Sequence, residues 1–273
     1  MVEKKLRYPT GVRPLLVEET ARRRRIESRF VNILEDAGFA EVVLPIIDYV
    51  DPYASVLSRD SSRLSYRFVD REGDLVSIRS DFTPMVARAL APTLDESQLP
   101  LRIFYRGDVI RCDASRLGVD RELFQIGAEI VGDPSLEADL AVMNLAAKIA
   151  REFGLAPRIV YNDTSIASLL SSDERHAVVT KRALTPADIA RRLTPEIAAR
   201  LEAMAAALDP STFALHLDDL DEETGYYTGI RFRLFGPDSR KAIAQGGRYD
   251  DVYQRFGAPA AAAGFTFTID DLD

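Results

Sequence analysis

Two long stretches in which apolar and polar residues alternate place the strongest constraint on how this chain folds. Residues 101–111 and 123–131 each alternate apolar and polar side chains, which is typical of half-buried β-strands. Between them lies the polar segment 112–122, which contains Gly118. The pattern predicts two strands joined by a long polar loop, an arrangement that can hold a nucleotide against a sheet.

The rest of the chain shows both helical and strand periodicity. Helices are predicted over residues 14–37, ended by Gly38, and over 137–153. Thr83 is predicted to cap a short helix that opens with Pro84. Further strands are predicted at 41–50 with an interruption at Pro45, at 64–69 and 75–79 around a turn, and at 158–161, 213–217, 227–235 and 241–245.

The order of these elements predicts the fold class. A strand-rich part is followed by an Ala- and Leu-rich helical stretch at 164–208, and strands then return. This order indicates an α+β protein built on an antiparallel sheet flanked by helices. We expect residues 1–273 to form one domain, with 164–208 as a small helical insertion.

Composition limits the possible functions. The chain has 273 residues, a net charge of −8 and one cysteine, Cys112. The acidic balance argues weakly against binding nucleic acid, and a single cysteine excludes an internal disulfide. No apolar run is long enough to predict a membrane span, so we expect a cytoplasmic protein. His176 and His216 lack metal-ligand spacing, so no metal site is predicted.

Polar residues gather on the two long predicted strands. Arg111 stands at the base of the loop and can bind a phosphate or a carboxylate. Gln125, Gly127 and Glu129 share one face of the second strand, with Gly127 leaving room for a small polar ligand between the other two. From the residues alone, a salt-bridged hairpin with a solvated face is an equal alternative.

A series of motifs resembles the class II aminoacyl-tRNA synthetases, and within them the histidyl enzyme. The similar segments follow in the family's order and cover essentially the whole chain. They are residues 38–45, 79–83, 111–129, 225–229 (Gly-Tyr-Tyr-Thr-Gly), 245–250 (Gln-Gly-Gly-Arg-Tyr-Asp) and 264–272. The resemblance implies the synthetase fold, with 38–45 at a dimer interface.

Three departures from the family pattern concern cations that hold ATP. The resemblance puts arginines of the active enzyme at the positions of Val119, Glu222 and Asp271. Adenylation depends on stabilising negative charge that develops at phosphate, and loss of one preorganised donor lowers the rate by about a hundredfold or more. The resemblance therefore implies that the chain does not form aminoacyl adenylates. The anticodon-binding domain of the synthetases is also not expected.

The amino-acid pocket of the family is better matched. The resemblance implies a histidine site, with no catalytic residue, metal or cofactor, formed by Asp81, Thr83, Arg111, Gln125, Glu129, Tyr226 and Tyr227. Asp81 and Glu129 would pair with the ammonium group, and Tyr227 with Glu129 would contact the imidazole. A vestigial pocket with core tyrosines is the alternative.

This combination resembles the regulatory subunits of ATP phosphoribosyltransferase. That resemblance implies a non-catalytic role in histidine biosynthesis and feedback control by histidine. It also implies a hetero-octamer, built on synthetase-like homodimers with a short-form catalytic subunit. An active amino-acid ligase and a tRNA-binding accessory protein are the rival hypotheses. Residues 48–60 and 164–208 are both candidates for the surface that faces the partner, and the sequence does not rank them.

Overall fold

The computed structural model describes residues 8–57, 64–112, 120–180, 184–220, 225–237 and 241–272, without the side chain of Asp271. Val119 and Glu222, two of the departures noted above, lie outside the described residues, as does the Asp271 side chain. Among the described helices, none is long and apolar enough to span a membrane.

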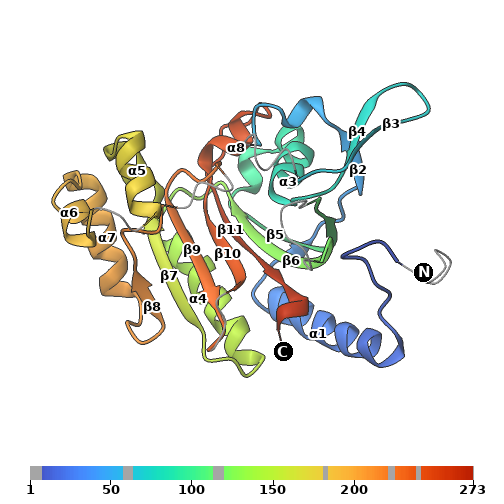
Figure 1. The fold of residues 1–273 in the computed structure, drawn as a ribbon, viewed down its shortest axis with the longest axis horizontal. Helices are drawn as coiled ribbons and strands as arrows, with labels where there is room; N and C mark the ends of the chain where they lie inside the picture. The colour runs from blue at the N-terminus through green and yellow to red at the C-terminus, as the bar shows by residue number, and fades with distance from the viewer. Residues whose placement is uncertain are drawn as a thin grey trace.

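Eight of the described strands form one large sheet, in the order β1-β5-β6-β11-β10-β9-β7-β8 (Figure 1). The strands are β1 (Ala40–Glu41), β5 (Leu101–Ile110), β6 (Glu122–Val131), β7 (Arg158–Asp163), β8 (Phe213–Leu215), β9 (Ile230–Phe235), β10 (Ala242–Arg248) and β11 (Ala262–Thr268). The central pairs are antiparallel, which confirms the predicted α+β class. The pairs β1–β5 and β7–β8, one at each edge, are parallel.

A second, smaller sheet has the order β2-β4-β3. It consists of β2 (Ile47–Tyr49), β3 (Arg67–Val69) and β4 (Leu75–Ile78). The hairpin β3–β4 confirms the predicted turn, in which Gly73 has a φ of 95°. The strand predicted over 41–50 is wrong in one respect. The chain splits it into β1 and β2, which join different sheets, and Pro45 lies in the break.

Helices cover one face of the large sheet. These are α1 (Val17–Asp36) and α4 (Leu136–Glu152), which lie against it in Figure 1. Phe30 and Leu34 of α1 pack with Phe265 and Phe267 of β11 in the main apolar core. The two phenylalanines therefore lie in the core. α1 ends in a Schellman motif, because Gly38 N–H donates to Glu35 O and Phe39 N–H to Leu34 O.

The remaining helices lie at the ends of the sheet. They are α3 (Thr83–Leu90), α5 (Ser172–Val179), α6 (Pro186–Ala190), α7 (Pro195–Ala207) and α8 (Asp250–Gln254), with 3₁₀ turns η2 (Asp51–Tyr53), η3 (Ala91–Thr93), η4 (Glu96–Gln98), η5 (Thr164–Leu169) and η6 (Ile269–Asp271). The elements α5, α6 and α7 confirm the helical character of 164–208, and Figure 1 shows them together beyond β7.

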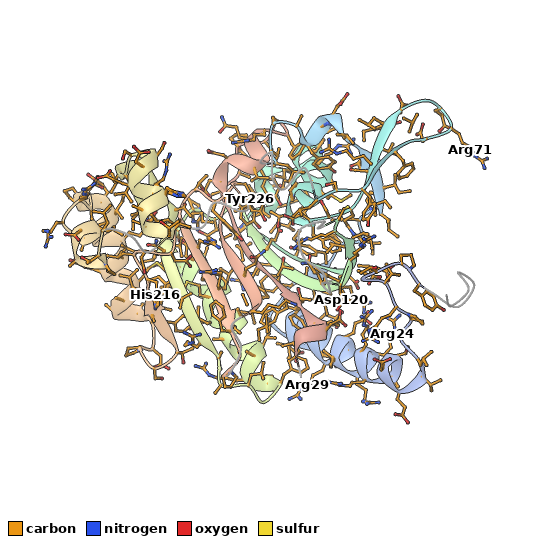
Figure 2. All side chains as sticks on the ribbon, in the orientation of Figure 1. Arg24, Arg29, Arg71, Asp120, His216 and Tyr226 are labelled. Atoms are coloured by element: carbon orange, nitrogen blue, oxygen red, sulfur yellow. The ribbon has the colours of Figure 1, made fainter. Side chains whose placement is uncertain are left out.

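One local prediction needs correction. Thr83 is not the N-cap of α3 but its first residue, because Phe82 occupies the cap without a side-chain hydrogen bond. The arginine run 22–25 forms a largely solvated face of α1, with Arg24 paired to Glu27. Arg23, however, pairs with Asp270 of η6 at 2.6 Å. Figure 2 shows Arg24 and Arg29 on α1, away from Tyr226.

Candidate functional site

The face of the large sheet that α1 and α4 leave uncovered carries a row of polar side chains. Antiparallel register places Gly127 of β6 opposite both Tyr105 of β5 and Thr266 of β11, and Thr266 opposite Gln245 of β10. Side chains of directly opposed residues lie on the same face of a sheet. These residues are therefore brought together from four adjacent strands.

A pocket with about 310 Å³ of unfilled space, part of it open to solvent, lies over this row. Its lining residues are Asp81, Thr83, Arg111, Gln125, Tyr226, Tyr227, Gln245, Gly246, Tyr249, Gly264, Phe265 and Thr266. Six of the seven residues predicted for the histidine site are in that set. The structure thus brings together residues that span positions 81 to 227, whatever ligand they bind.

Glu129, the seventh predicted residue, does not line the pocket. Its side chain is fully buried behind the lining, and a Cβ built on the lining residue Gly264 would approach Glu129 Cγ and Tyr249 Oη at 2.8 Å each. Neither carboxylate oxygen of Glu129 makes a hydrogen bond, and the hydroxyls of Tyr249 and Tyr253 also lack one. Burial raises the pKa of Glu129 to about 8.

Asp81 is held at the entrance of α3. Its Oδ1 accepts a hydrogen bond from Thr83 N–H at 3.2 Å, and its Oδ2 accepts one from Tyr226 Oη at 3.2 Å. Burial raises the pKa of Asp81, while the Arg111 guanidinium acts in the opposite direction. Arg111 itself is anchored by a bond from Nε to Ser80 O at 3.0 Å.

Gly127 has a different role from the one predicted. A Cβ at this position would lie 2.5 Å from the Tyr105 ring. Tyr105 crosses above Gly127, and its hydroxyl shares a 2.9 Å hydrogen bond with Thr266 Oγ1 on the next strand. The space between Gln125 and Glu129 is therefore filled by a tyrosine ring and is not free for a ligand.

Sequence reasoning missed several residues of this region: Tyr105, Gln245, Tyr249, Tyr253 and Thr266. Gln245 and Tyr249 belong to a recognised motif, and strand alternation carries a signal for the others once the register is known. The tyrosines form a ring cluster, with Tyr226 and Tyr227 centroids 5.0 Å apart and Tyr226 and Tyr249 centroids 6.0 Å apart. Burial raises the pKa of each of these three tyrosines, so their hydroxyls are neutral at ordinary pH.

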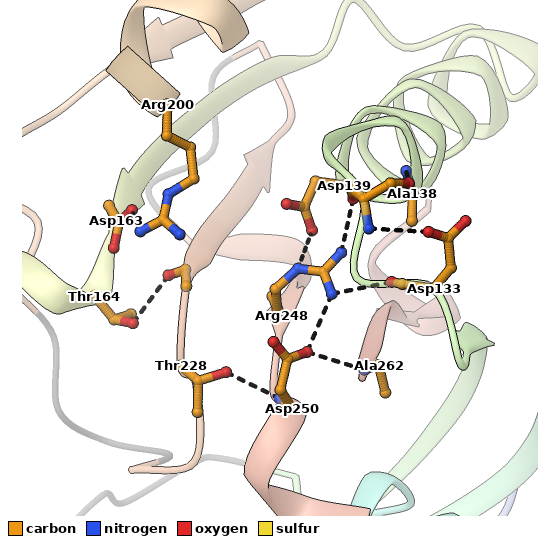
Figure 3. A network of polar contacts seen from close by, with 12 residues as sticks. Asp133, Ala138, Asp139, Asp163, Thr164, Arg200, Thr228, Arg248, Asp250 and Ala262 are labelled. Carbon is orange, nitrogen blue, oxygen red and sulfur yellow. Dashed lines mark hydrogen bonds and ion pairs between the residues drawn. The ribbon is translucent and has the colours of Figure 1, made fainter. Parts of the chain in front are cut away.

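A buried ion-pair network fixes the chain on both sides of Tyr249 (Figure 3). Arg248 Nε donates to Asp139 Oδ1 at 2.8 Å, and its Nη1 donates to Asp250 Oδ1 at 3.1 Å. The same guanidinium also donates to the carbonyl oxygens of Asp133 and Ser135. We call Arg248, Asp139 and Asp250 the arginine clamp.

The two histidines stand apart from this site. His176 and His216 are exposed, and Figure 2 shows His216 far from Tyr226. Among the described residues, no group of three or more His, Cys, Asp or Glu side chains could hold a metal ion.

Comparison with known proteins identifies the relatives of this fold. The histidyl-tRNA synthetase family model matches residues 11–184 and 161–272. The chain superposes with a TM-score of 0.82 on a histidine–tRNA ligase subunit from Alicyclobacillus acidocaldarius, at 26% identity, covering 100% of this chain and 97% of that one. It also superposes, at 0.82 and 22% identity, on an ATP phosphoribosyltransferase regulatory subunit/histidyl-tRNA synthetase from Bacillus halodurans, covering 98% and 82%.

Curated relatives of this chain are described as ATP phosphoribosyltransferase regulatory subunits. An ATP phosphoribosyltransferase regulatory subunit from Geobacter metallireducens is 32% identical over 310 aligned residues, covering 96% of this chain and 71% of the relative. One from Symbiobacterium thermophilum is 31% identical, covering 97% and 78%. The chain therefore belongs to the ATP phosphoribosyltransferase regulatory subunit family, on the histidyl-tRNA synthetase fold.

Proposed function

We propose that this chain is a non-catalytic regulatory subunit of ATP phosphoribosyltransferase that binds histidine as a feedback effector of histidine biosynthesis in the cytoplasm. The observation that carries this proposal is the pocket over β5, β6, β10 and β11. Its lining combines one acidic residue, Asp81, with one arginine and neutral tyrosines, and the carboxyl group of Glu129 lies buried behind it. A small zwitterion with a polar ring matches that combination of charges.

Each end of the ligand has a partner. Asp81, held by Tyr226 and Thr83, receives the ammonium group, and Arg111 on the open side receives the carboxylate. Gln125 hydrogen-bonds near the main-chain end. Glu129 with Tyr227 addresses the imidazole, either directly or through the hydroxyl of Tyr249 beside it.

The proposal excludes adenylate formation on the basis of charge. The resemblance places Glu222, Asp271 and Val119 at positions where the active enzymes carry arginine. Two carboxylates near the phosphates would destabilise the transition state that arginines stabilise. The rival ligase activity predicts histidine-dependent exchange of pyrophosphate into ATP, and such exchange above background would reject this part of the proposal.

The catalytic partner in this proposal is a short-form phosphoribosyltransferase, with homodimers of this chain inside a hetero-octamer. An exposed apolar surface supports the homodimer. It consists of Val43, Ile46, Ile47, Tyr49, Phe68, Val69 and Leu75, and Val43 is 90% exposed. Exposed apolar side chains that gather on one small sheet and the segment before it are typical of surfaces that proteins cover on association. Val43→Lys should shift the sedimentation of the isolated chain toward monomer, whereas Val179→Lys, an exposed change on α5, should not.

Calorimetry with free histidine tests the effector role. The wild-type chain is expected to bind histidine, and binding should change when the transferase is present, because an effector that alters catalysis must couple to the complex. Coupling of about 1–3 kcal/mol would be typical. Gln125→Ala should weaken binding, and Gln254→Ala, an exposed change on α8, should leave it intact. No binding in either sample would remove the histidine site from the proposal.

A further inference from the structure

The most unusual feature of the pocket is the cluster of polar atoms behind it. Glu129 is fully buried, and neither of its oxygens is hydrogen-bonded. Tyr249 Oη and Tyr253 Oη are buried without partners as well. A buried ionised carboxylate without a partner is strongly destabilised, so such a group stays protonated until something compensates its charge.

The groups that face Glu129 leave it little compensation. Tyr105 comes from β5, Thr83 from the start of α3, Asp81 from the segment before α3, and Tyr249 and Tyr253 from the β10–α8 segment. The hydroxyls of Tyr249, Thr83 and Tyr105 act to lower the pKa of Glu129, and burial outweighs them. Asp81 adds a second negative charge, and its cation Arg111 lies with it at the pocket. The tyrosine hydroxyls are neutral because burial raises their pKa well above 10. Among the described residues, no cation therefore donates a hydrogen bond to Glu129.

We propose that histidine binds with a single proton shared between its imidazole and the buried carboxyl group of Glu129, so that affinity is highest near neutral pH and falls on both sides. This inference rests on the proposed function. The proton leaves the Glu129 carboxyl oxygen and reaches one imidazole nitrogen through the Tyr249 hydroxyl, which lies beside Glu129 and lines the pocket. Tyr249 gives up its own proton as it receives the one from Glu129, so it stays neutral. The complex holds the same number of protons in either form.

The pH dependence follows from the two free partners. Free Glu129 carries the proton up to a pKa of about 8, and free imidazole is neutral above a pKa of about 6.5. Between these values the partners together hold the one proton that the complex needs, and binding neither takes up nor releases one. At lower pH one proton must leave, and at higher pH one must enter, so affinity falls by up to about tenfold per pH unit.

An ordinary ionised carboxylate predicts the opposite trend. It would attract the imidazolium form, so binding at pH 7 would take up most of a proton and affinity would rise as the pH falls to 5.5. With a shared proton, binding takes up or releases almost no proton at pH 7 and releases nearly one at pH 5.5. The affinity for histidine then falls several-fold as the pH is lowered from 7 to 5.5. The two cases differ in sign, which makes the test decisive.

The experiment is titration calorimetry of the full chain at pH 5.5 and pH 7, in two buffers with different ionisation enthalpies. Triazolylalanine, whose ring stays neutral at pH 5.5, serves as the matched ligand, because any proton released by Asp81 is common to both ligands. Histidine should release nearly one proton more than triazolylalanine at pH 5.5 and no more at pH 7. Equal release at pH 5.5, or uptake of most of a proton at pH 7, overturns the inference while the histidine site stands.

The variant Glu129→Gln supplies a second readout. An amide cannot lose a proton, so the several-fold fall in affinity from pH 7 to pH 8.5 should shrink, while the contribution of the ligand's amino group remains. An unchanged fall in the variant overturns the role of Glu129. Absence of binding of both ligands to wild-type protein at every pH overturns the proposed function and this inference together.

Discussion

Two buried charged regions lie one residue apart on the same segment of chain. The first is the arginine clamp, in which Arg248 pairs with Asp139 and Asp250. The second is the pocket cluster, the buried polar groups of Glu129, Tyr249 and Tyr253, whose oxygens have no hydrogen-bond partner. In the clamp, four of the bonds made by the guanidinium go to oxygens of α4, of the turn before it, and of α8. In the cluster, the oxygens of Glu129 have none.

The difference separates two uses of buried polarity. A paired charge with satisfied donors fixes backbone, here the end of β10 and the start of α8. An unpaired carboxyl group fixes no backbone and lowers stability, and for this reason we propose that a ligand compensates it. The clamp therefore stabilises the fold, whereas the cluster lies where we propose that the ligand binds.

The largest expected effect comes from breaking the clamp. Arg248→Met leaves Asp139 buried without its cation, and removing one member of a buried pair destabilises a protein by roughly 3–5 kcal/mol. Urea denaturation at pH 7 should show a much lower midpoint. Arg191→Met removes a surface pair with Asp188 and should leave the midpoint close to wild type. Equal midpoints for the two variants would contradict the structural role of the clamp.

The second effect is a gain in stability at high pH from Glu129→Gln. The folded pKa of about 8 exceeds the ordinary value of 4.5, so the folded chain retains a proton that the unfolded chain loses. Stability contributed by this group is therefore full below pH 4.5 and declines as the pH rises to 8. The variant removes that decline, and its stability relative to wild type should increase by on the order of 3 kcal/mol between pH 5 and pH 9.

Urea midpoints measured across that pH range check this prediction. Glu152→Gln is the matched control, since Glu152 lies on the exposed side of α4 and pairs with Arg29 at the surface. Its difference from wild type should stay nearly constant with pH. If the difference in urea midpoint between Glu129→Gln and wild type is equally constant with pH, Glu129 is ionised in the folded state at neutral pH.

The sequence predicts six of the residues that line the pocket, but not how the residues around them are arranged. Alternation placed Gln125 and Glu129 on one face of a strand, and the structure agrees. Alternation does not state which residue lies opposite on the next strand, however. For that reason Tyr105 was missed, and Gly127 was interpreted as room for ligand when it makes room for the Tyr105 ring.

The clamp could not be predicted for a related reason. Its residues lie 109 positions apart in sequence, at the first turn of α4 and the last residue of β10. The Gln245–Asp250 motif marked Arg248 as notable without naming a partner. Local periodicity predicts elements, such as α1 and the β3–β4 hairpin, but long-range pairing of charges depends on tertiary packing.

A smaller effect is expected at the floor of the pocket. In Gly264→Ala, the new Cβ would meet Ala128 O at 2.6 Å and Tyr249 Oη at 2.8 Å, so strands β6 and β11 must shift. Overpacking of this kind lowers stability by roughly 1–3 kcal/mol. Histidine affinity should fall as well, because Tyr249 and Glu129 are displaced. Gly229→Ala, whose Cβ meets nothing closer than 3.3 Å, should lower both less.

The smallest effect compares two hydroxyls of the same cluster. Tyr105→Phe removes a hydrogen bond to Thr266 and should lower the unfolding free energy by about 0.5–1.5 kcal/mol. Tyr253→Phe removes a buried hydroxyl that has no partner, so stability should be unchanged or slightly higher. Both substitutions delete one oxygen from a fully buried ring, and urea midpoints compare them directly. If Tyr253→Phe lowers stability more than Tyr105→Phe, the Tyr253 hydroxyl is hydrogen-bonded in the folded protein. The contrast between a hydrogen-bonded clamp and a cluster without hydrogen bonds then fails at this residue.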